Sequence, residues 1–133
     1  ADFEIILIDP REHFATQERF PNCKIFNEWP DEALSNFTLD QATHLVTLTH
    51  DPKIDDPALI HVLKRNIGYI GSLGSKKTHQ KRCERLLHLN FSKNDLSKIH
   101  GPIGLNIRAK TPAEIAISIM GEIVSFRRQN NDK

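Results

Sequence analysis

A strand that turns through glycine into a helix, at residues 69–79, constrains the fold of this chain more than any other stretch. An apolar run reaches Ile70, two glycines follow, and a helical pattern begins after Ser75. Such a turn presents free backbone N–H groups at the start of a helix, where the helix dipole favours negative charge. We therefore expect an anion contact from Gly71, Gly74, Ser75, Lys76, Lys77, Thr78 and His79.

A simpler interpretation of this turn stays open. It could be a tight connection followed by a basic helix face in solvent. It is not a Walker A motif, which requires Gly-x-x-x-x-Gly-Lys followed by Ser or Thr.

Apolar runs alternate with helical patterns along the whole chain. Continuous apolar or β-branched runs predict strands at residues 4–9, 24–27, 43–49 and 68–73. Helical patterns predict helices at about 29–37, from Asp55 to Arg65, after Ser75, and at 92–99 with Ser92 and Asp95 as a capping box. In the helix after Ser75, we expect Cys83, Leu86 and Leu87 to face inward and Lys76, Lys81, Arg82 and Arg85 to face outward.

The last helix has the clearest start. Thr111, Pro112 and Glu114 supply an N-cap, a proline at N1 and a glutamate at N3. Behind them, one apolar stripe predicts packing on the sheet; it consists of Ile115, Ala116, Ile119, Met120, Ile123 and Val124. We expect a single domain over residues 1–126 and a polar tail over 127–133.

Strands that alternate with helices predict an α/β fold, a Rossmann-like doubly wound parallel sheet. In such sheets, ligands bind beyond the carboxyl ends of the strands. Two further strand ends then join the glycine turn at one edge, with Asp9 and Arg11 after the first, and Thr49, His50 and Asp51 after the third. The glycine-bearing loop after residue 99 could cover the same edge with His100, Gly101, Pro102, Gly104 and Asn106.

Asp9 has two interpretations. Dinucleotide-binding folds place an acid at this strand end for the ribose hydroxyls, whereas a turn before Pro10 also accommodates an acid. A dinucleotide site also requires a preceding strand with a Gly-x-Gly-x-x-Gly turn, and the sequence has none. We therefore expect either a Rossmann unit that lacks its first strand and glycine-rich turn, or a site for another ligand.

Net charge, apolar run length and cysteine spacing argue against several classes of function. The formal net charge of +1 gives no whole-protein case for nucleic acid or an anionic membrane surface. We expect no membrane span and no metal site, because neither a long apolar run nor metal-ligand spacing occurs. Cys23 and Cys83 form neither a disulfide framework nor a zinc pattern, which favours reduced thiols and a cytoplasmic protein.

Three blocks of sequence, in order, resemble a known family. They are residues 47–57, residues 69–79, and residues 100–116, which read His-Gly-Pro-Ile-Gly-Leu-Asn-Ile-Arg-Ala-Lys-Thr-Pro-Ala-Glu-Ile-Ala. Together they resemble the carboxyl-terminal Rossmann domain of the XdhC/CoxI family, and the resemblance extends from Ile5 to about Val124. These are accessory proteins of xanthine dehydrogenase and related molybdenum hydroxylases.

The resemblance implies a cofactor-binding maturation factor rather than a catalyst. Such proteins bind molybdenum cofactor (molybdopterin), support its sulfuration with a cysteine desulfurase, and pass it to the apo-enzyme of the molybdenum hydroxylase. The strand-end residues named above would then contact the cofactor. The alternative is an NAD(P)-binding Rossmann oxidoreductase domain. Since a sheet that lacks a strand exposes unpaired backbone, we also expect a homo-oligomer.

Overall fold

The structure, a computed structural model, describes residues 3–131 and confirms an α/β fold with parallel strands. Strands and helices alternate along the chain as expected, and every predicted strand is present within two residues of its expected ends. The strands are β1 (Ile6–Ile8), β2 (Lys24–Phe26), β3 (His44–Thr47), β4 (Tyr69–Ser72) and β5 (Ile99–His100), and the helices are α1 (Pro30–Leu34), α2 (Pro52–Leu63), α3 (Lys76–His88), α4 (Lys93–Leu96) and α5 (Pro112–Asn131).

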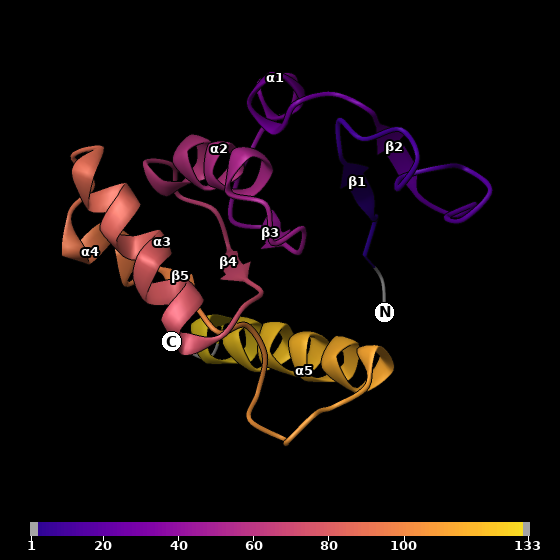
Figure 1. The fold of residues 1–133 in the computed structure, drawn as a ribbon. Coiled ribbons are helices and arrows are strands. Elements are labelled where there is room, and N and C mark those ends of the chain that lie inside the picture. The colour runs from indigo at the N-terminus through magenta and orange to yellow at the C-terminus, as the bar shows by residue number, and fades with distance from the viewer. Residues whose placement is uncertain (1–2, 132–133) are drawn as a thin grey trace.

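The strands form two parallel groups. β1 pairs with β2, and the second sheet has the order β3-β4-β5, with His44 opposite Tyr69 and Ile70 opposite Ile99. Within the described residues, no backbone hydrogen bond joins β1 to β3. Figure 1 shows the two groups as separate pieces, with β1 and β2 set apart from β3 and β4.

Side chains connect the two groups instead. Phe3, just before β1, packs edge-to-face on His44 at the start of β3, with ring centroids 5.5 Å apart. Ile8 packs against the core beneath α2. The chain proceeds from β1 to β2, and then in the second group from β3 through β4 to β5, so the topological switch point lies between β1 and β3.

The two faces of β4 carry two different cores. Ile70 packs with Leu59, Val62 and Leu63 of α2 and with Leu86 of α3. On the opposite face lies a second cluster, made by Tyr69, Ile103, Ile119 and Ile123, that holds α5 against the sheet (Figure 1). This division follows from the period of two along a strand.

Two element boundaries differ from expectation. Helix α2 begins at Pro52 rather than Asp55, because the Asp51 carboxylate accepts a hydrogen bond from the Lys53 N–H at 3.0 Å and caps the helix there. The predicted helix at 92–99 ends at Leu96, and β5 follows it. The short β5 was missed because two residues carry no periodicity; the predicted Ser92–Asp95 capping box is confirmed.

Helix α5 differs more. It starts as predicted, since the Glu114 N–H donates to Thr111 Oγ1 and the Thr111 N–H donates to the Glu114 carboxylate. It then continues to Asn131, so residues 127–131 of the predicted tail are helical, while 132 and 133 lie outside the described residues. The apolar stripe was predicted to face the sheet as a whole, which is wrong: Ile119 and Ile123 are buried, but Ala116, Met120 and Val124 are exposed.

None of the helices within residues 3–131 is both long and apolar enough to cross a membrane.

Candidate functional site

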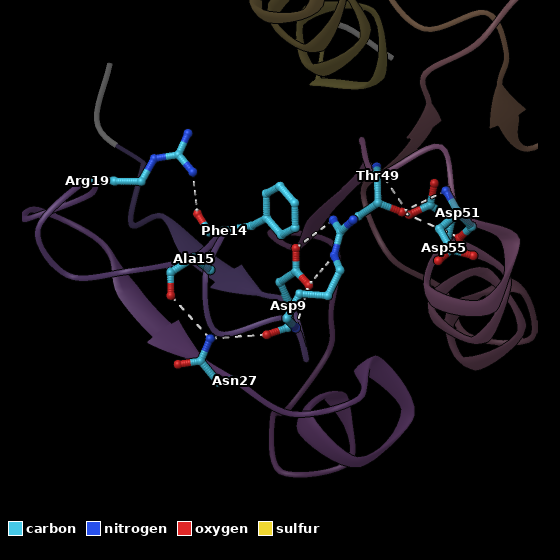
Figure 2. A network of polar contacts seen from close by, with 9 residues as sticks. Asp9, Phe14, Ala15, Arg19, Asn27, Thr49, Asp51 and Asp55 are labelled. Carbon is cyan, nitrogen blue, oxygen red and sulfur yellow. Dashed lines mark hydrogen bonds and ion pairs between the residues drawn. The ribbon is translucent and has the colours of Figure 1, made fainter.

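The carboxyl ends of β1 and β3 meet at the switch point. Figure 2 shows Asp9 and Asn27 on the side of the first two strands, and Thr49, Asp51 and Asp55 beside the start of α2. Asp9 follows β1, and Thr49 and Asp51 follow β3, so residues from both groups of strands lie near one another here. This edge is where doubly wound proteins bind their ligands.

Asp9 is held by Arg11. The Arg11 backbone N–H and Nε each donate to Asp9 Oδ1, at 2.9 and 3.0 Å, and NH2 donates to Oδ2 at 2.9 Å. Burial raises the pKa of the Asp9 carboxyl, but these hydrogen bonds and the Arg11 charge outweigh it and leave that pKa below its usual range. The Arg11 guanidinium also lies 4.3 Å from the centre of the Phe14 ring. Both Asp9 oxygens are therefore occupied within the chain.

The loop from β3 to α2 is also internally bonded. Thr49 Oγ1 donates to Asp55 Oδ1 at 2.6 Å and accepts from the Asp51 N–H at 3.1 Å. Between them, His50 has a positive φ of 64°, and its side chain is exposed. The hydrogen bonds and charge of Asp9 raise the pKa of Arg11, and the charges of Asp51 and Asp55 add smaller effects in the same direction.

The glycine turn after β4 divides into two parts. Gly71 lies within the strand, and the space that a Cβ would occupy is filled by Ile103 Cδ1 at 2.5 Å and by Tyr69. Gly74 has a φ of 141°, which side chains rarely adopt. The helix α3 begins after Ser75, as predicted, and Ser75 caps it by accepting from the Thr78 N–H at 3.1 Å; Lys76 and Lys77 are exposed in the first turn.

Arg82 does not face outward as predicted; it is only 3% exposed. Its NH2 donates to the Leu73 carbonyl at 2.9 Å, its NH1 lies 3.1 Å from His79 Nδ1, and its buried Nε has no partner. No carboxylate among the described residues lies within ion-pair distance of Arg82. The expectation was wrong because the guanidinium fastens the end of the glycine turn to α3, a tertiary contact that helical spacing does not reveal. Leu87, expected inside, is 41% exposed instead.

Arg82 influences the protonation of two neighbours on α3, His79 and Cys83. A guanidinium only donates, so His79 Nδ1 accepts and Nε2 carries the proton. That Nε2 lies 3.4 Å from Cys83 Sγ. Burial and the Arg82 charge lower the pKa of His79, while burial raises the pKa of the Cys83 thiol against a smaller opposing effect of Arg82. At neutral pH both groups are uncharged, and the Cys83 side chain packs against the core.

A small hollow lies between α2 and α3, at the same edge. Its volume is about 90 Å³. Asp55 accepts from the Thr49 hydroxyl and keeps its charge, and Asp56 is paired with Arg85 at 2.8 Å, so the three cations of the lining exceed its two carboxylates by one. We call it the α2–α3 hollow; its lining residues are His50, Pro52, Asp55, Asp56, Thr78, Lys81, Arg82 and Arg85.

The hollow contains only two residues of the predicted set, His50 and Thr78. Sequence reasoning missed the others, although Thr78, Lys81, Arg82 and Arg85 recur at helical spacing on one face of α3. That spacing was the available signal, and it was interpreted as a solvated face. Within residues 3–131, no group of three or more potential metal ligands is present.

The loop after β5 is only partly near this edge. A Cβ on Gly101 would lie 2.2 Å from His79 Nδ1, so this glycine is in contact with α3. His100 instead stacks on Tyr69, with ring centroids 4.7 Å apart, and its Nδ1 is 3.6 Å from Glu122 of α5. Gly104 contacts α5 through Ser118, and both Pro102 and Asn106 are exposed.

Replacing Arg11 with glutamine is expected to raise the pKa of Asp9, because burial then acts without the opposing cation. A carboxyl whose folded pKa is depressed stabilises the fold above about pH 4, and this contribution is lost as the pH falls through the folded pKa. Carbon-detected NMR titration measures the shift. Asp95, whose pKa is lowered by its hydrogen bonds to Ser92, is the internal control. An unchanged Asp9 titration would contradict the prediction.

A profile of the XdhC Rossmann domain matches residues 1–123. The chain belongs to this family. It is 32% identical over 128 residues to a protein of Bacillus subtilis described as a probable xanthine dehydrogenase subunit, and this match covers 96% of the chain and 37% of that protein. It is 30% identical over 103 residues to the "Molybdenum cofactor insertion chaperone PaoD" of Escherichia coli, in a match that covers 77% of the chain and 32% of PaoD.

A solved structure agrees with the fold. A crystal structure described as a xanthine dehydrogenase from Bacillus halodurans superposes with a TM-score of 0.79 and 30% identity, over 96% of this chain and 36% of that one. This XdhC Rossmann domain therefore spans about a third of the length of these relatives. The resemblance noted in the sequence is confirmed, and the chain is an XdhC-family accessory domain related to a molybdenum cofactor insertion chaperone.

Proposed function

We propose that this XdhC Rossmann domain binds a molybdopterin-type cofactor with its phosphate in the α2–α3 hollow, and serves in cofactor delivery to a xanthine dehydrogenase-type apo-enzyme. The observation that carries the proposal is the buried Arg82 at the lining of a hollow beside the switch point. The similarity to PaoD supports molybdenum cofactor as the ligand.

The charges of the hollow favour an anion. Its lining carries three cations, Lys81, Arg82 and Arg85, and two carboxylates, Asp55 and Asp56, so the cations are in excess by one. Arg85 pairs with Asp56, whereas Asp55 and Asp56 act on the Arg82 charge only from beyond ion-pair distance. A bound phosphate would give this buried guanidinium a direct partner. Guanidinium and ammonium donors are also the groups that bind phosphate best in proteins.

The size of the hollow limits what enters it. Sites that enclose whole small molecules occupy about 300–1,000 Å³, several times the volume between α2 and α3. The pterin would therefore lie outside it, along the edge that carries Asp9, Arg11 and Thr49. The start of α3, with Gly74 and Ser75, would border the phosphate, with Lys76 and Lys77 beside it.

The NAD(P) alternative has weaker support. A ribose hydroxyl would have to donate to Asp9, yet both of its oxygens accept from Arg11. We keep a nicotinamide dinucleotide as a competing ligand for the same titration. The remaining parts of the proposal are a cysteine desulfurase as a second partner and a cytoplasmic setting.

Anaerobic isothermal titration with molybdenum cofactor released from a molybdoenzyme tests the proposal. We expect binding by the chain, and about tenfold weaker binding by Lys81→Gln, equivalent to about 1.4 kcal/mol. Lys93→Gln is the matched control, since it removes an exposed lysine of α4 that does not line the hollow. Absence of binding by a chain with an intact circular dichroism spectrum would refute the proposal.

Two further outcomes test the position of the phosphate and the identity of the ligand separately. A larger loss in Lys77→Gln than in Lys81→Gln would place the phosphate at the glycine turn instead of the hollow. Binding of NADH or NADPH without binding of molybdenum cofactor would favour the oxidoreductase alternative.

A further inference from the structure

The outward face of α5 is apolar, which is unusual for a helix on the surface. Ile117 is 65% exposed, Val124 45% and Met120 37%. With Ala116 and Gly121 they line one shallow, apolar depression. We call these five residues the outer stripe. Contiguous apolar surface of this kind usually marks a site of association.

A loop residue extends the outer stripe sideways. A Cβ built on Gly121 would lie 3.0 Å from Leu105 Cδ1, so the Leu105 side chain lies beside this glycine. Leu105 is itself 43% exposed. The loop and the helix therefore present one apolar surface, and its lowest point is the glycine.

The charges around the outer stripe are arranged symmetrically. Glu114 lies seven residues before Gly121 and Arg128 lies seven residues after it, and both side chains are exposed. Seven residues are close to two helical turns, so all three positions share one side of α5. When two copies of such a helix cross antiparallel near Gly121, Glu114 of each copy faces Arg128 of the other.

We infer that two copies of this chain associate through α5, antiparallel about a two-fold axis between Met120 and Gly121. Around that axis, Ile117 of one copy packs against Val124 of the second, and Met120 against Gly121. Glycine lets the two helices approach closely, and the antiparallel orientation places opposite helix dipole ends together. The interface is isologous, as two-fold dimers require.

The charge pattern favours a second copy as the occupant. A partner of other chemistry would need no relation between the two ends of α5, whereas antiparallel self-pairing is stabilised by opposite charges at similar distances from the axis; Glu114 can take part because it is exposed, although it also caps its own helix. The side chains involved are few, so the interface belongs to the small class and the dimer is expected to dissociate in the micromolar range. This inference does not depend on the proposed cofactor site, which lies at the strand ends beside α2 and α3.

Sedimentation equilibrium over a broad concentration range tests the inference on the chain. We expect a monomer–dimer equilibrium that Ile117→Glu weakens by about tenfold or more, because the change buries two carboxylates near the axis. Leu87→Glu is the matched control: it changes an exposed apolar residue of α3 to the same charged one. The control is expected to leave the equilibrium unchanged.

Two outcomes would overturn the inference. One is a chain that stays monomeric at several hundred micromolar, roughly a hundredfold above the expected dissociation constant; another part of a longer protein would then be the candidate to cover α5. The other is a dimer that Ile117→Glu leaves intact, which would place the contact elsewhere, with the open sheet edges as the next candidate.

Cross-linking tests the orientation. In a Cys23→Ser/Cys83→Ala background, chains with Ile117→Cys are mixed with chains with Val124→Cys and oxidised. Antiparallel pairing predicts a disulfide mainly between the two different chains, which mass spectrometry resolves by their masses. A product dominated by links between identical Ile117→Cys chains would refute the antiparallel arrangement.

Discussion

Replacing Arg82 with alanine is expected to lower the free energy of unfolding by about 3 kcal/mol. The change removes a side chain that is 3% exposed, together with its hydrogen bond to the Leu73 carbonyl and its contact with His79 Nδ1. Cavity formation and an unsatisfied buried carbonyl each cost about 1–3 kcal/mol in comparable sites. Urea unfolding followed by circular dichroism at pH 7 measures the loss.

A comparison with Arg82→Met separates volume from charge. Methionine fills most of the same space and removes a buried cation that has no carboxylate within contact distance in the described residues, so its cost is expected to be about 1 kcal/mol. Arg85→Ala is the surface control, since Arg85 pairs with Asp56 while its side chain is 40% exposed. A loss below about 1 kcal/mol in Arg82→Ala would contradict the role of the guanidinium in fastening the glycine turn.

Replacing Gly71 with alanine is expected to destabilise the domain by about 2 kcal/mol, although only one methyl group is added. The new Cβ would lie 2.5 Å from Ile103 Cδ1 and 2.8 Å from Tyr69 Cε1. Both neighbours are almost fully buried, so they cannot move toward solvent to relieve the clash. Overpacking of a core typically costs about 1–3 kcal/mol. The loss is again measured by urea unfolding.

The double variant Gly71→Ala/Ile103→Ala tests the cause. Ile103→Ala alone is expected to cost about 2–4 kcal/mol through the cavity that it leaves. In the double variant, the alanine methyl occupies part of that space, so the combined loss should be smaller than the sum of the two separate losses by about 1 kcal/mol or more. Strict additivity would show that Gly71 is required for a reason other than its contact with Ile103.

Features with a local chemical signal could be predicted from the sequence. The helix starts at Ser92 and Thr111 were found because a side chain bonds to a backbone N–H within a few residues, and the start after Ser75 was found from the helical pattern that follows it. The parallel α/β fold followed from the alternation of apolar runs and helical patterns. The placement of Asp9 and Thr49 at one edge then followed from the fold.

Features that depend on a distant partner could not be predicted in this way. Arg82 resembles any basic residue on an exposed helix face, and only the path of the glycine turn makes it buried. The apolar stripe of α5 is wide enough to cover more than one face, so periodicity alone could not distinguish Ile119, which packs on the sheet, from Met120, which does not. The contact of Gly71 with Ile103 could not be predicted either, because Ile103 lies 32 positions later in the sequence.

The separation of β1 from β3 has a consequence for ligand selectivity. In a continuous sheet, the ladder fixes neighbouring strands about 4.8 Å apart and thereby sets the width of the site. Here, within the described residues, only side chains span that width, through Phe3 on His44, Ile8 in the core and the charge of Arg11. The residues on each side of this separation are hydrogen-bonded among themselves: Arg11 donates to Asp9, and Thr49 donates to Asp55. For the ligand proposed above, we therefore expect sharp selectivity for the chemical groups that contact Asp9 and Thr49, and weaker selectivity for the length of the molecule that connects them.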